Sequence, residues 1–423
     1  MSSYSERYLL SSSGSDRATA YGFSNKMISL GNRTHVVWTD AVAFTRGRTF
    51  DHSTGAWGET LALGEGCDNH NNPCLTADRE GRLHLAYGPH DRWDNVHQVA
   101  LWPAGMFKHA IAAEPNSLRG LERCNPPFGY SATYAGLAHT AEGCDAIVYR
   151  GGEPPRPLLF QKQNGPEAWT QAQALFRQDI APQYTFYGGR LAATADGLLY
   201  VGAHLYAEAR GHSLGVMAIR SADFGRTWTD LTGQPATVPV AYEARFAAPH
   251  PPAEFDPRLG GLGVAPDGRL WVLTHAAKAG CYQSQLSCWQ GRRWETIEIA
   301  RFLPEPWGCV DGPLTIDTCG RIHLFVSAVD RRVPPPGQEL FGHAGLAVFH
   351  LCSPDQGASF TCQRISPPDP EVPNWLPSVS LTGAYHPVAR VALLYTRGRP
   401  QTNAEVGCRH TVETEVYCVF VLD

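Results

Sequence analysis

A short apolar strand follows a turn glycine in residues 81–88, which read Gly-Arg-Leu-His-Leu-Ala-Tyr-Gly. Segments of the same kind recur along the chain, and seven of them can be aligned by their turn. They begin at Asn32, Gly81, Gly143, Gly197, Gly268, Gly320 and Ala389, so neighbouring segments start 49 to 71 residues apart. Glycine suits these turns because it accepts the positive φ angle that a tight hairpin requires. The spacing indicates a repeat protein.

Each repeat contains more than one strand. An apolar segment precedes most of the turns, as in residues 189–197, and further strand-like segments follow several of them, as in residues 215–232. Four short antiparallel strands per repeat, seven times over, predict an all-β chain folded as a seven-bladed β-propeller. Such a ring closes on itself and so protects the edges of its sheets. We expect a single catalytic domain over residues 1–423, with the Pro-rich insertions 97–130 and 230–258 forming loops at its faces.

The composition excludes several classes of protein. The formal net charge is -5 and only 18% of the residues are charged, without a basic cluster, so we expect no nucleic-acid partner. No stretch approaches about 18 uninterrupted apolar residues, so we expect no contact with a membrane through a spanning segment. The 42 Gly and 32 Pro residues work against long helices. The N-terminal stretch has no apolar signal-peptide region, and we expect a monomer.

Residues 221–228, Ser-Ala-Asp-Phe-Gly-Arg-Thr-Trp, match the Asp-box pattern S-x-D-x-G-x-T-W, and a weaker copy begins at Ser353. In this turn the aspartate accepts backbone hydrogen bonds, the glycine takes the special backbone angle and the tryptophan packs beneath the blade. We interpret it as a folding device at the blade periphery. It resembles the turn of sialidase-like propellers with BNR repeats. The early F-R-I-P-like arginine motif of sialidases is absent, which leaves sialidase activity as a minor alternative.

Two histidines are expected at the same rim of one blade. His70 stands just before the first strand of its repeat, and His90 stands just after the second. Antiparallel strands joined by the 78–81 turn bring these two ends side by side. An imidazole titrates near neutral pH and is suited to proton transfer. The chain has 17 histidines, so a purely structural pair is the alternative interpretation.

The next two repeats place polar side chains at matching positions. In one of them Tyr134 holds the strand start and Arg150 follows the second strand. The following repeat has Tyr187 and Arg190 at its start and His204 after its strand. In a propeller, that end of the blades lines the central depression, and concave sites of this kind are where ligands bind. We therefore expect these side chains to surround one site.

The motifs D-N-H-x-N-P, from residue 68, and G-R-L-H-x-x-Y-G-P-H, from residue 81, are followed by T-Y at 133–134 and Y-R at 149–150. Together they resemble the BNR-type seven-bladed polysaccharide lyases, which include ulvan lyases and rhamnose–glucuronate lyases. The resemblance is clearest over residues 64–206 and implies a lyase that cleaves a uronic-acid-containing glycan of the rhamnose–glucuronate or ulvan-like kind. It assigns catalysis to His70, His90, Tyr134 and Arg150, and substrate binding to Asn69, Tyr187, Arg190 and His204.

β-Elimination at a uronic acid needs a group that neutralises the carboxylate, a base for the C5 proton and an acid for the departing O4. Arg150 suits the carboxylate because a guanidinium stays charged and can bind it bidentately. His70 or His90 suits the base, and Tyr134 or the other histidine suits the acid, each contributing about 10²–10⁴-fold. These roles could be exchanged. Asn69 would help to polarise the carboxylate.

Two other functions remain open on the same scaffold. Propeller rhamnosidases share the fold but use a different histidine on the opposite face, so a glycoside hydrolase with saturated products is one alternative. The other is a carbohydrate-binding propeller in which the histidine, tyrosine and arginine side chains only hold the ligand. The expected partner is a polysaccharide or oligosaccharide in each case. The sequence leaves open whether cleavage is internal or terminal.

The 12 cysteines fall into six couples of near neighbours: 67/74, 124/144, 281/288, 309/319, 352/362 and 408/418. An even number of locally coupled cysteines predicts disulfides and an oxidising compartment, extracellular or periplasmic. Buried thiols are an alternative. No C-x-x-C is present, which weakens a zinc-ribbon interpretation. We expect no cofactor for the chemistry. Related lyases can hold a structural calcium or zinc ion, for which the sequence offers no convincing ligand set.

Overall fold

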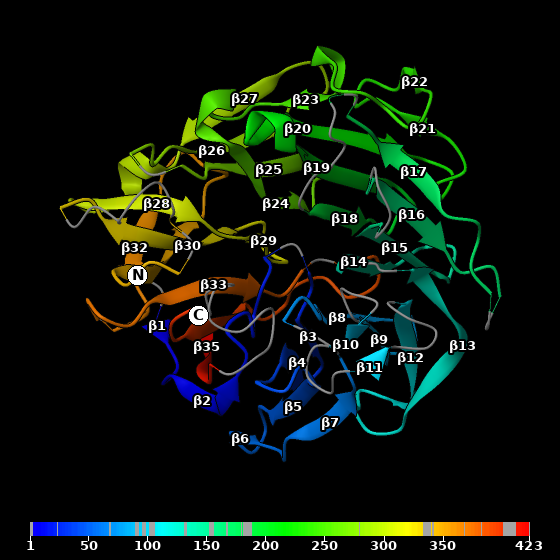
Figure 1. Ribbon diagram of the computed structural model, residues 1–423, viewed down its shortest axis with the longest axis vertical. Helices are drawn as coiled ribbons and strands as arrows, with labels where there is room; N and C mark the ends of the chain where they lie inside the picture. The colour runs from blue at the N-terminus through cyan, green and yellow to red at the C-terminus, as the bar shows by residue number, and fades with distance from the viewer. Residues whose placement is uncertain are drawn as a thin grey trace.

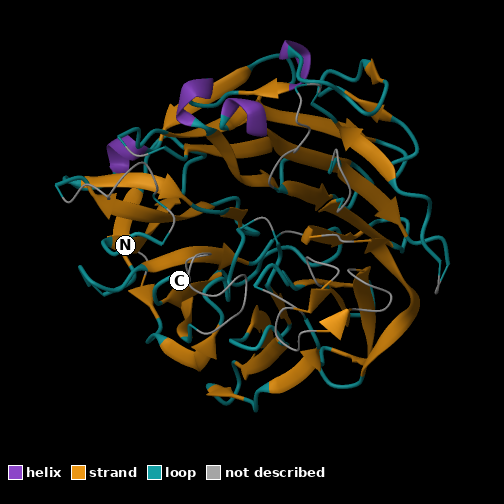
Figure 2. Ribbon diagram, in the orientation of Figure 1, coloured by secondary structure: helices purple, strands orange, loops and turns teal. Residues whose placement is uncertain are grey.

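The computed structural model describes residues 3–22, 24–66, 69–88, 93–94, 99–100, 106–130, 133–151, 156–165, 168–178, 180, 188–278, 280–332, 340, 342–367, 369–381, 383–400 and 412–422. Seven sheets of four to six strands are arranged in a ring (Figure 1), which confirms the predicted all-β, seven-bladed β-propeller. Helix in these parts is confined to short 3-10 segments (Figure 2): η1 (Glu208–Arg210), η2 (Ala244–Phe246), η3 (Ala253–Phe255) and η4 (Ala300–Phe302). None of the described helices is long and apolar enough to cross a membrane.

The blades are numbered in chain order. The first blade contains β3 (Met27–Leu30), β4 (Arg33–Thr39), β5 (Thr45–Asp51), β6 (Ala56–Trp57) and β7 (Leu61–Gly64). The second contains β8 (Cys74–Ala77), β9 (Arg82–Tyr87), β12 (Met106–Pro115) and β13 (Leu121–Tyr130), and a separate ribbon pairs β10 (Trp93–Asp94) with β11 (Val99–Ala100). The third contains β14 (Thr133–His139), β15 (Asp145–Arg150), β16 (Leu158–Lys162) and β17 (Gln173–Phe176).

The remaining blades follow the same plan. The fourth contains β18 (Gly189–Ala193), β19 (Leu199–Ala207), β20 (His212–Ser221), β21 (Trp228–Thr229), β22 (Pro235–Ala236) and β23 (Ala247–Ala248). The fifth contains β24 (Pro257–Val264), β25 (Leu270–Ala276), β26 (Ser284–Trp289) and β27 (Trp294–Glu298). The sixth contains β28 (Trp307–Asp311), β29 (Leu314–Ile316), β30 (Ile322–Asp330), β31 (Leu346–Ser353) and β32 (Thr361–Arg364).

The seventh blade closes the ring by joining the two ends of the chain. Its strands are β33 (Asn374–Val379), β34 (Ala392–Arg397), β35 (Thr414–Leu422), β1 (Ser3–Tyr4) and β2 (Tyr8–Gly14). Ser3 pairs with Leu422 and Tyr8 pairs with Cys418, so the N-terminal strands complete the sheet that the C-terminal strand begins. Opening the ring would therefore require two antiparallel ladders to separate.

The first strands of successive blades line the central axis. Contacts link β3 to β8, β8 to β14, β14 to β18, and β18 to β24. Because each of these strands is followed by an antiparallel neighbour, the start of the first strand and the end of the second lie at the same rim. We call this the entry rim, which includes residues 69–73, 133–134, 150, 189–190 and 204. The opposite edge, the turn rim, includes residues 78–82, 194–198, 265–269 and 317–321.

The predicted strand–turn–strand unit recurs on the turn rim with the same hydrogen bonds. The Asp78 N–H donates to Arg82 O at 3.0 Å, and the Arg82 N–H donates back to Asp78 Oδ1 at 2.8 Å. The corresponding distances between Asp317 and Arg321 are 3.1 and 2.8 Å. Gly81 has a φ of 83°, which explains the glycine at this position. In these two turns the aspartate and the arginine also form an ion pair, so their charges are paired within the turn itself.

The prediction that residues 97–130 form a face loop is wrong. Most of this insertion is β12 and β13, the outer hairpin of the second blade. The consecutive prolines that suggested a loop, Pro126 and Pro127, lie in β13, which is the edge strand of its sheet. A residue without an N–H is tolerated there because one side of the strand makes no ladder bonds. The 230–258 insertion is loop interrupted by β22, β23, η2 and η3.

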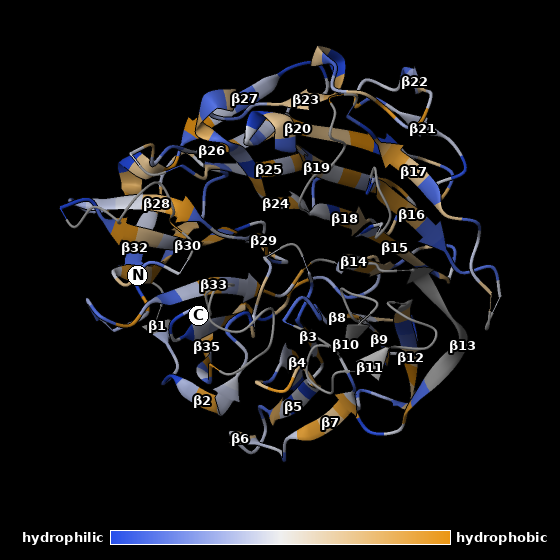
Figure 3. Cartoon of the chain, in the orientation of Figure 1, coloured by the Kyte–Doolittle hydropathy of each residue, from blue (hydrophilic) through white to orange (hydrophobic). Residues whose placement is uncertain are grey.

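Apolar cores fill the spaces between neighbouring blades. Figure 3 shows hydrophobic positions along many strands, including β7 and β16. Between the third and fourth blades, the ring centroids of Phe160 and Trp228 lie 5.3 Å apart, and Trp228 is buried. The turn that ends at Trp228 is held by the Gly225 N–H, which donates to Ser221 Oγ at 2.8 Å. This turn therefore anchors a large aromatic side chain between two blades.

The predicted disulfides are wrong for the couples whose two side chains are both described, which are free thiols: 281/288, 309/319 and 352/362. Strand register gives the reason in the last couple. Cys352 pairs with Thr361 and Leu351 pairs with Cys362, so the two sulfurs leave opposite faces of the sheet. The other couples each have one cysteine whose side chain lies outside the described residues: Cys67, Cys124 and Cys408. The spacing of the cysteines along the sequence therefore does not indicate an oxidising compartment.

Candidate active site

Tyr134 and Arg150 meet at the entry rim of the third blade, as predicted. Thr133, at the start of β14, pairs with Arg150, at the end of β15. The Arg150 Cζ lies 4.8 Å from the centre of the Tyr134 ring, over its face. Both side chains are buried, with 1% of Arg150 and 2% of Tyr134 exposed. The cation is thus held against the phenol by stacking as well as by the strand register.

His70 joins this pair from the segment that precedes β8. Its ring centroid lies 6.0 Å from that of Tyr134. The His70 carbonyl oxygen accepts hydrogen bonds from Thr133 Oγ1 at 3.0 Å and from Asn72 Nδ2 at 2.8 Å. The bond from Thr133 fastens this segment of the second blade to the first strand of the third. An imidazole, a phenol and a guanidinium therefore converge from two adjacent blades.

The backbone at Tyr134 is unusual for a bulky residue. Its φ angle is 60°, in the left-handed region that a side chain with a Cβ rarely adopts. The register between β14 and β15 shifts between Thr133 and Gly136, which is the mark of a bulge. Bulges redirect side chains, and strain of this kind persists where the surrounding structure enforces it. The regular strand geometry of β14 is therefore interrupted at Tyr134.

Arg17 belongs to the site, and the sequence analysis missed it. It lies between β2 and β3, and its NH1 is hydrogen-bonded to Nε2 of His70. A guanidinium only donates, so Nε2 of His70 is the acceptor and a neutral ring carries its proton on Nδ1. Arg17 is 53 residues from His70 in the chain, and no motif surrounds it. Only closure of the ring brings the two together.

Asn69 and Lys26 lie close to the same segment. The Asn69 side chain is buried, and its Nδ2 donates to Asp16 Oδ1 at 2.9 Å. The Lys26 side chain is fully buried, and its Nζ donates to the carbonyl oxygen of Pro73 at 3.1 Å. Burial lowers the pKa of Lys26 to about 7, so its charge is sensitive to changes near neutral pH. Lys26 is a second residue that the sequence analysis did not identify.

Arg190 is a buried cation without a partner among the described residues. It lies on β18 opposite Gly202 of β19, and 0% of its surface is exposed. None of its three guanidinium nitrogens has a hydrogen-bond acceptor in the described parts of the chain. Burial lowers the pKa of Arg190 to about 9, which still leaves the group charged at neutral pH. Burial of such a group lowers the stability of the fold unless an anion pairs with it.

His204 lies on the same face of the fourth blade as Arg190. Arg190 pairs with Gly202, and His204 is two residues beyond Gly202, so the two side chains share a face of the sheet. The His204 Nδ1 accepts the N–H of Leu259 at 3.3 Å, and its Nε2 has no partner among the described residues. Burial, with a smaller contribution from Arg258, holds the pKa of His204 well below its usual range. This histidine is therefore neutral.

The fourth blade packs directly against the strand that carries Tyr134. A Cβ atom added to Gly136 would lie 3.4 Å from the carbonyl oxygen of Gly189. Two residues before Gly136 stands Tyr134, and one residue after Gly189 stands Arg190. Tyr134 and Arg190 are thus brought to neighbouring strands. His90 and Tyr187, which were predicted in the same site, lie outside the described residues.

Asp311 is a carboxyl group that the sequence analysis missed. It ends β28, and burial raises its pKa to about 6. A Cβ atom added to Gly22 would lie 3.3 Å from Pro313, and the neighbouring Tyr21 has its ring centroid 5.1 Å from that of Tyr134. This part of the sixth blade therefore borders the segment that reaches the candidate site. No pattern in the sequence distinguishes Asp311 from other strand-end aspartates.

The entry rim favours an anionic ligand. Basic side chains reach this rim from the third and fourth blades, Arg150 and Arg190, and from the segment before the first blade, Arg17 and Lys26. Guanidinium groups bind carboxylates and sulfates through paired, charge-assisted hydrogen bonds. Within the described part of the chain, the groups of donor atoms that converge closely enough for a metal ion lie in the second and third blades and in the sixth blade. The geometry of this rim thus suits acid–base chemistry on an anion.

Comparisons with known proteins agree with the fold. A PL25 ulvan lyase has 15% sequence identity, covers 96% of this chain and 94% of its own, and superimposes with a TM-score of 0.69. A PL25 ulvan lyase bound to -[GlcA(1-4)Rha3S]- gives the same values. The polysaccharide lyase Uly1 has 12% identity, covers 99% of this chain and 100% of its own, and has a TM-score of 0.60. No curated protein matches the sequence.

The sequence profile of the BNR repeat-containing family matches residues 18–302 of the 423. This match begins within the segment that carries Arg17 and runs through the fifth blade. It covers every residue that the sequence analysis assigned to the site. The chain therefore belongs to the BNR repeat-containing family.

Proposed function

We propose that this protein is a polysaccharide lyase that cleaves a uronic-acid-containing glycan by β-elimination. The convergence of His70, Tyr134 and Arg150 at the entry rim is the observation that carries the proposal. These side chains supply an imidazole, a phenol and a guanidinium, the three kinds of group that the reaction uses. The fold shared with ulvan lyases is consistent with this function.

The first task is to make the C5 proton of the uronic acid removable. Arg150 would bind the carboxylate and stabilise the negative charge that spreads onto it when the proton leaves. A buried guanidinium is effective here because little water screens it. Asn69 Nδ2, which donates one hydrogen to Asp16, would donate its other hydrogen to the same carboxylate. Binding by Arg150 is therefore stronger in the transition state than in the ground state, as catalysis requires.

The second task is to transfer two protons. His70 is the base candidate within the described residues, and His90 is the other candidate. The contact with Arg17 keeps Nε2 of His70 unprotonated, which is the form that a base needs. An anionic substrate would compete for the Arg17 guanidinium and leave Nε2 able to accept the C5 proton. Tyr134 would protonate the departing O4. The second histidine is the alternative acid.

The substrate that we propose contains a rhamnose–glucuronate or ulvan-like linkage. The related PL25 ulvan lyase was solved with -[GlcA(1-4)Rha3S]-, which carries both a carboxylate and a sulfate. Arg190 is buried and lacks a partner among the described residues, so it can bind a second anionic group of such a chain. His204, on the same face, would contribute a neutral hydrogen-bonding group. A polymeric substrate of this kind fits an extracellular or periplasmic enzyme.

A panel of uronate polysaccharides tests the proposal. Purified protein should release oligosaccharides from at least one polymer that contains glucuronate next to rhamnose, and the products should absorb in the ultraviolet band of the C4–C5 double bond. Arg150→Ala should bind the same polymer and release products about 10³-fold more slowly. Binding without cleavage by the wild-type protein would instead support the carbohydrate-binding alternative, and saturated products would support a hydrolase.

A further inference from the structure

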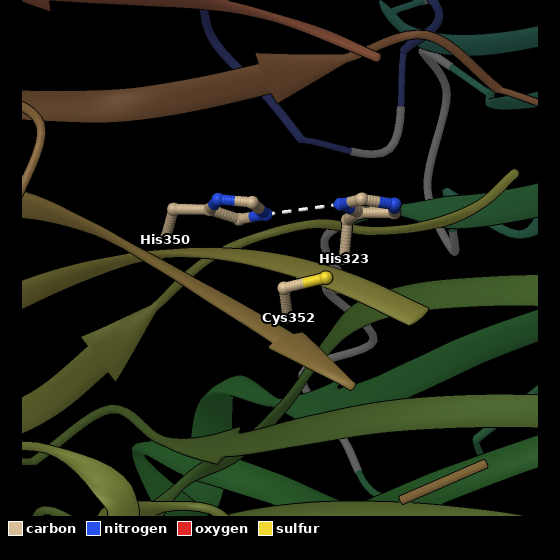
Figure 4. A group of neighbouring side chains, drawn as sticks. All are labelled: His323, His350 and Cys352. Carbon is tan, nitrogen blue, oxygen red and sulfur yellow. Dashed lines mark hydrogen bonds between the residues drawn. The ribbon is translucent and has the colours of Figure 1, made fainter. Parts of the chain in front are cut away.

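Three metal-binding side chains meet in the sixth blade, away from the entry rim. His323 on β30 lies directly opposite Cys352 on β31, and His350 lies two residues before Cys352. Because side chains alternate between the two faces of a strand, all three project from the same face of the sheet. All three are buried. Figure 4 shows the two imidazole rings facing each other through one nitrogen each, with the cysteine sulfur beside His323.

The donor atoms are close enough to share one ion. His323 Nδ1 lies 3.0 Å from His350 Nε2, and these atoms and Cys352 Sγ all lie within 4.8 Å of one another. Two nitrogens bound to a tetrahedral zinc ion, with bonds of about 2.0–2.1 Å, are about 3.3 Å apart. The two rings are therefore within a few tenths of an ångström of the spacing that coordination needs.

The outer nitrogen of each ring has its own partner. His323 Nε2 lies 3.3 Å from Asp317 Oδ2, and His350 Nδ1 lies 2.7 Å from the Tyr4 hydroxyl. Histidine ligands of metals commonly donate their second N–H to a carboxylate or another oxygen, which fixes the tautomer and turns the ring toward the ion. Both rings are therefore oriented so that their remaining nitrogens point at one spot.

We infer that His323, His350 and Cys352 bind a zinc ion. Two imidazoles and a thiolate are donors that zinc prefers, and the set is typical of three-ligand sites with one open position. Binding releases one proton, from the Cys352 thiol. The His350 proton moves to Nδ1, from which it donates to the Tyr4 oxygen. The fourth ligand is water, which can enter from a cavity of about 660 Å³ lined by Tyr4 and His323.

A second group of converging donors, in the second and third blades, is accounted for without a metal ion. Asp145 Oδ2 lies 2.6 Å from His84 Nδ1 and 2.7 Å from His109 Nε2. A carboxylate between two rings accepts an N–H from each, so ordinary hydrogen bonds account for the arrangement. In the sixth blade no carboxylate separates the two facing nitrogens. The third donor there, Cys352, supplies a sulfur, which is a preferred zinc ligand.

The proposed ion would strengthen the closure of the ring. Tyr4, which contacts His350, belongs to β1 in the seventh blade. The same junction contains a core in which Phe325 and Val348 of the sixth blade pack with Val391 of the seventh. A metal ion that binds only the folded form stabilises it by mass action. This role is independent of the proposed lyase activity.

Cobalt binding to the whole chain tests the site directly. After chelation and dialysis, the wild-type protein should bind one equivalent of Co²⁺ with the visible bands of a tetrahedral site and a thiolate-to-cobalt charge-transfer band. Zinc should displace the cobalt. Cys352→Ala should lose the charge-transfer band and bind Co²⁺ at least about 10-fold more weakly, and Asp317→Asn should keep the band with about 10-fold weaker binding.

Cys362→Ser is the matched control, because Cys362 lies on the neighbouring strand with its sulfur on the opposite face. This variant should bind cobalt like the wild type. The inference is overturned if the folded wild-type protein binds no cobalt, or if Cys352→Ala keeps the thiolate band. Should Cys352→Ala fail to fold, the presence or absence of the band in the wild type and in Cys362→Ser still decides.

Discussion

Charged side chains have different partners on the two rims of the propeller. On the turn rim, Asp78 and Arg82 bond to each other within one turn, and Asp317 and Arg321 do the same. On the entry rim, Arg150 lies over an aromatic ring, and Arg190 has no partner among the described residues. Charges satisfied within a turn serve the fold. Buried cations that cost stability are retained where a ligand supplies the missing anion.

Backbone geometry shows the same difference. Positive φ angles on the turn rim fall on glycine, as at Gly81, where they cost little. On the entry rim the positive φ falls on Tyr134, a bulky residue. Strain that the surrounding structure enforces is typical of functional positions. Substitutions on the entry rim are therefore expected to change activity, and those on the turn rim stability.

Arg150→Ala should have the largest effect. Loss of the group proposed to bind the carboxylate is expected to lower kcat/KM for elimination by about 10³-fold, because the charge that develops there is stabilised chiefly in the transition state. Arg82→Ala, an arginine of the turn rim, is the control and should stay within about two-fold of wild type. Both would be measured as the initial rate of double-bond absorbance. Equal losses in the two variants would contradict the comparison.

Tyr134→Phe should lower kcat by about 10²-fold while leaving the fold intact. The substitution keeps the ring that Arg150 stacks on and removes only the hydroxyl that would protonate O4. Urea unfolding should give a free energy close to that of the wild type. A variant that keeps wild-type kcat would exclude Tyr134 as the acid and leave that role to a histidine.

Arg190→Met tests whether the unpartnered cation is there for the ligand. The variant should be more stable than the wild type by about 1–2 kcal/mol, because an uncompensated buried charge is removed. Its KM for the polysaccharide should rise by about 10-fold, which corresponds to about 1.4 kcal/mol of binding. Thermal unfolding and initial rates measure the two effects. A less stable variant with unchanged KM would make Arg190 a structural residue.

Asp311→Asn tests the comparison through the pH dependence of the unfolding free energy. Burial raises the pKa of Asp311 to about 6, above the value of about 3.9 in an unfolded chain. Between these values the folded form binds more protons than the unfolded form, so this group makes the wild type lose stability as the pH rises from about 4 to 6. The variant should therefore exceed the wild type in unfolding free energy at pH 8 and match it near pH 4. A constant difference would point to another cause.

The repeated turns made the fold predictable from sequence. A turn between two apolar strands is a local feature, with a glycine of positive φ in six of the seven repeats, and seven such repeats imply ring closure. The insertion 97–130 was misjudged because prolines are excluded from central strands but not from an edge strand such as β13. The cysteine couples failed because near neighbours in sequence, such as Cys352 and Cys362, point to opposite faces of the sheet.

The candidate site was predictable only where strand ends define it. Tyr134 and Arg150 flank one hairpin, so their meeting follows from antiparallel pairing. Arg17 reaches His70 from a segment before the first blade, and such a contact depends on how the ring closes. The proposed zinc site in the sixth blade could not be predicted for the same reason. His323 and Cys352 are brought face to face by a register that no local motif encodes.

The central claim is that the chain cleaves its substrate by elimination and not by hydrolysis. Digestion in ¹⁸O-labelled water, followed by mass spectrometry of the oligosaccharides, separates the two reactions. Elimination adds no water across the cleaved bond, so the products should carry a C4–C5 double bond, be lighter by one water than hydrolysis products, and contain no ¹⁸O fixed at the cleavage site. Saturated products that carry one ¹⁸O per cleavage would contradict the account.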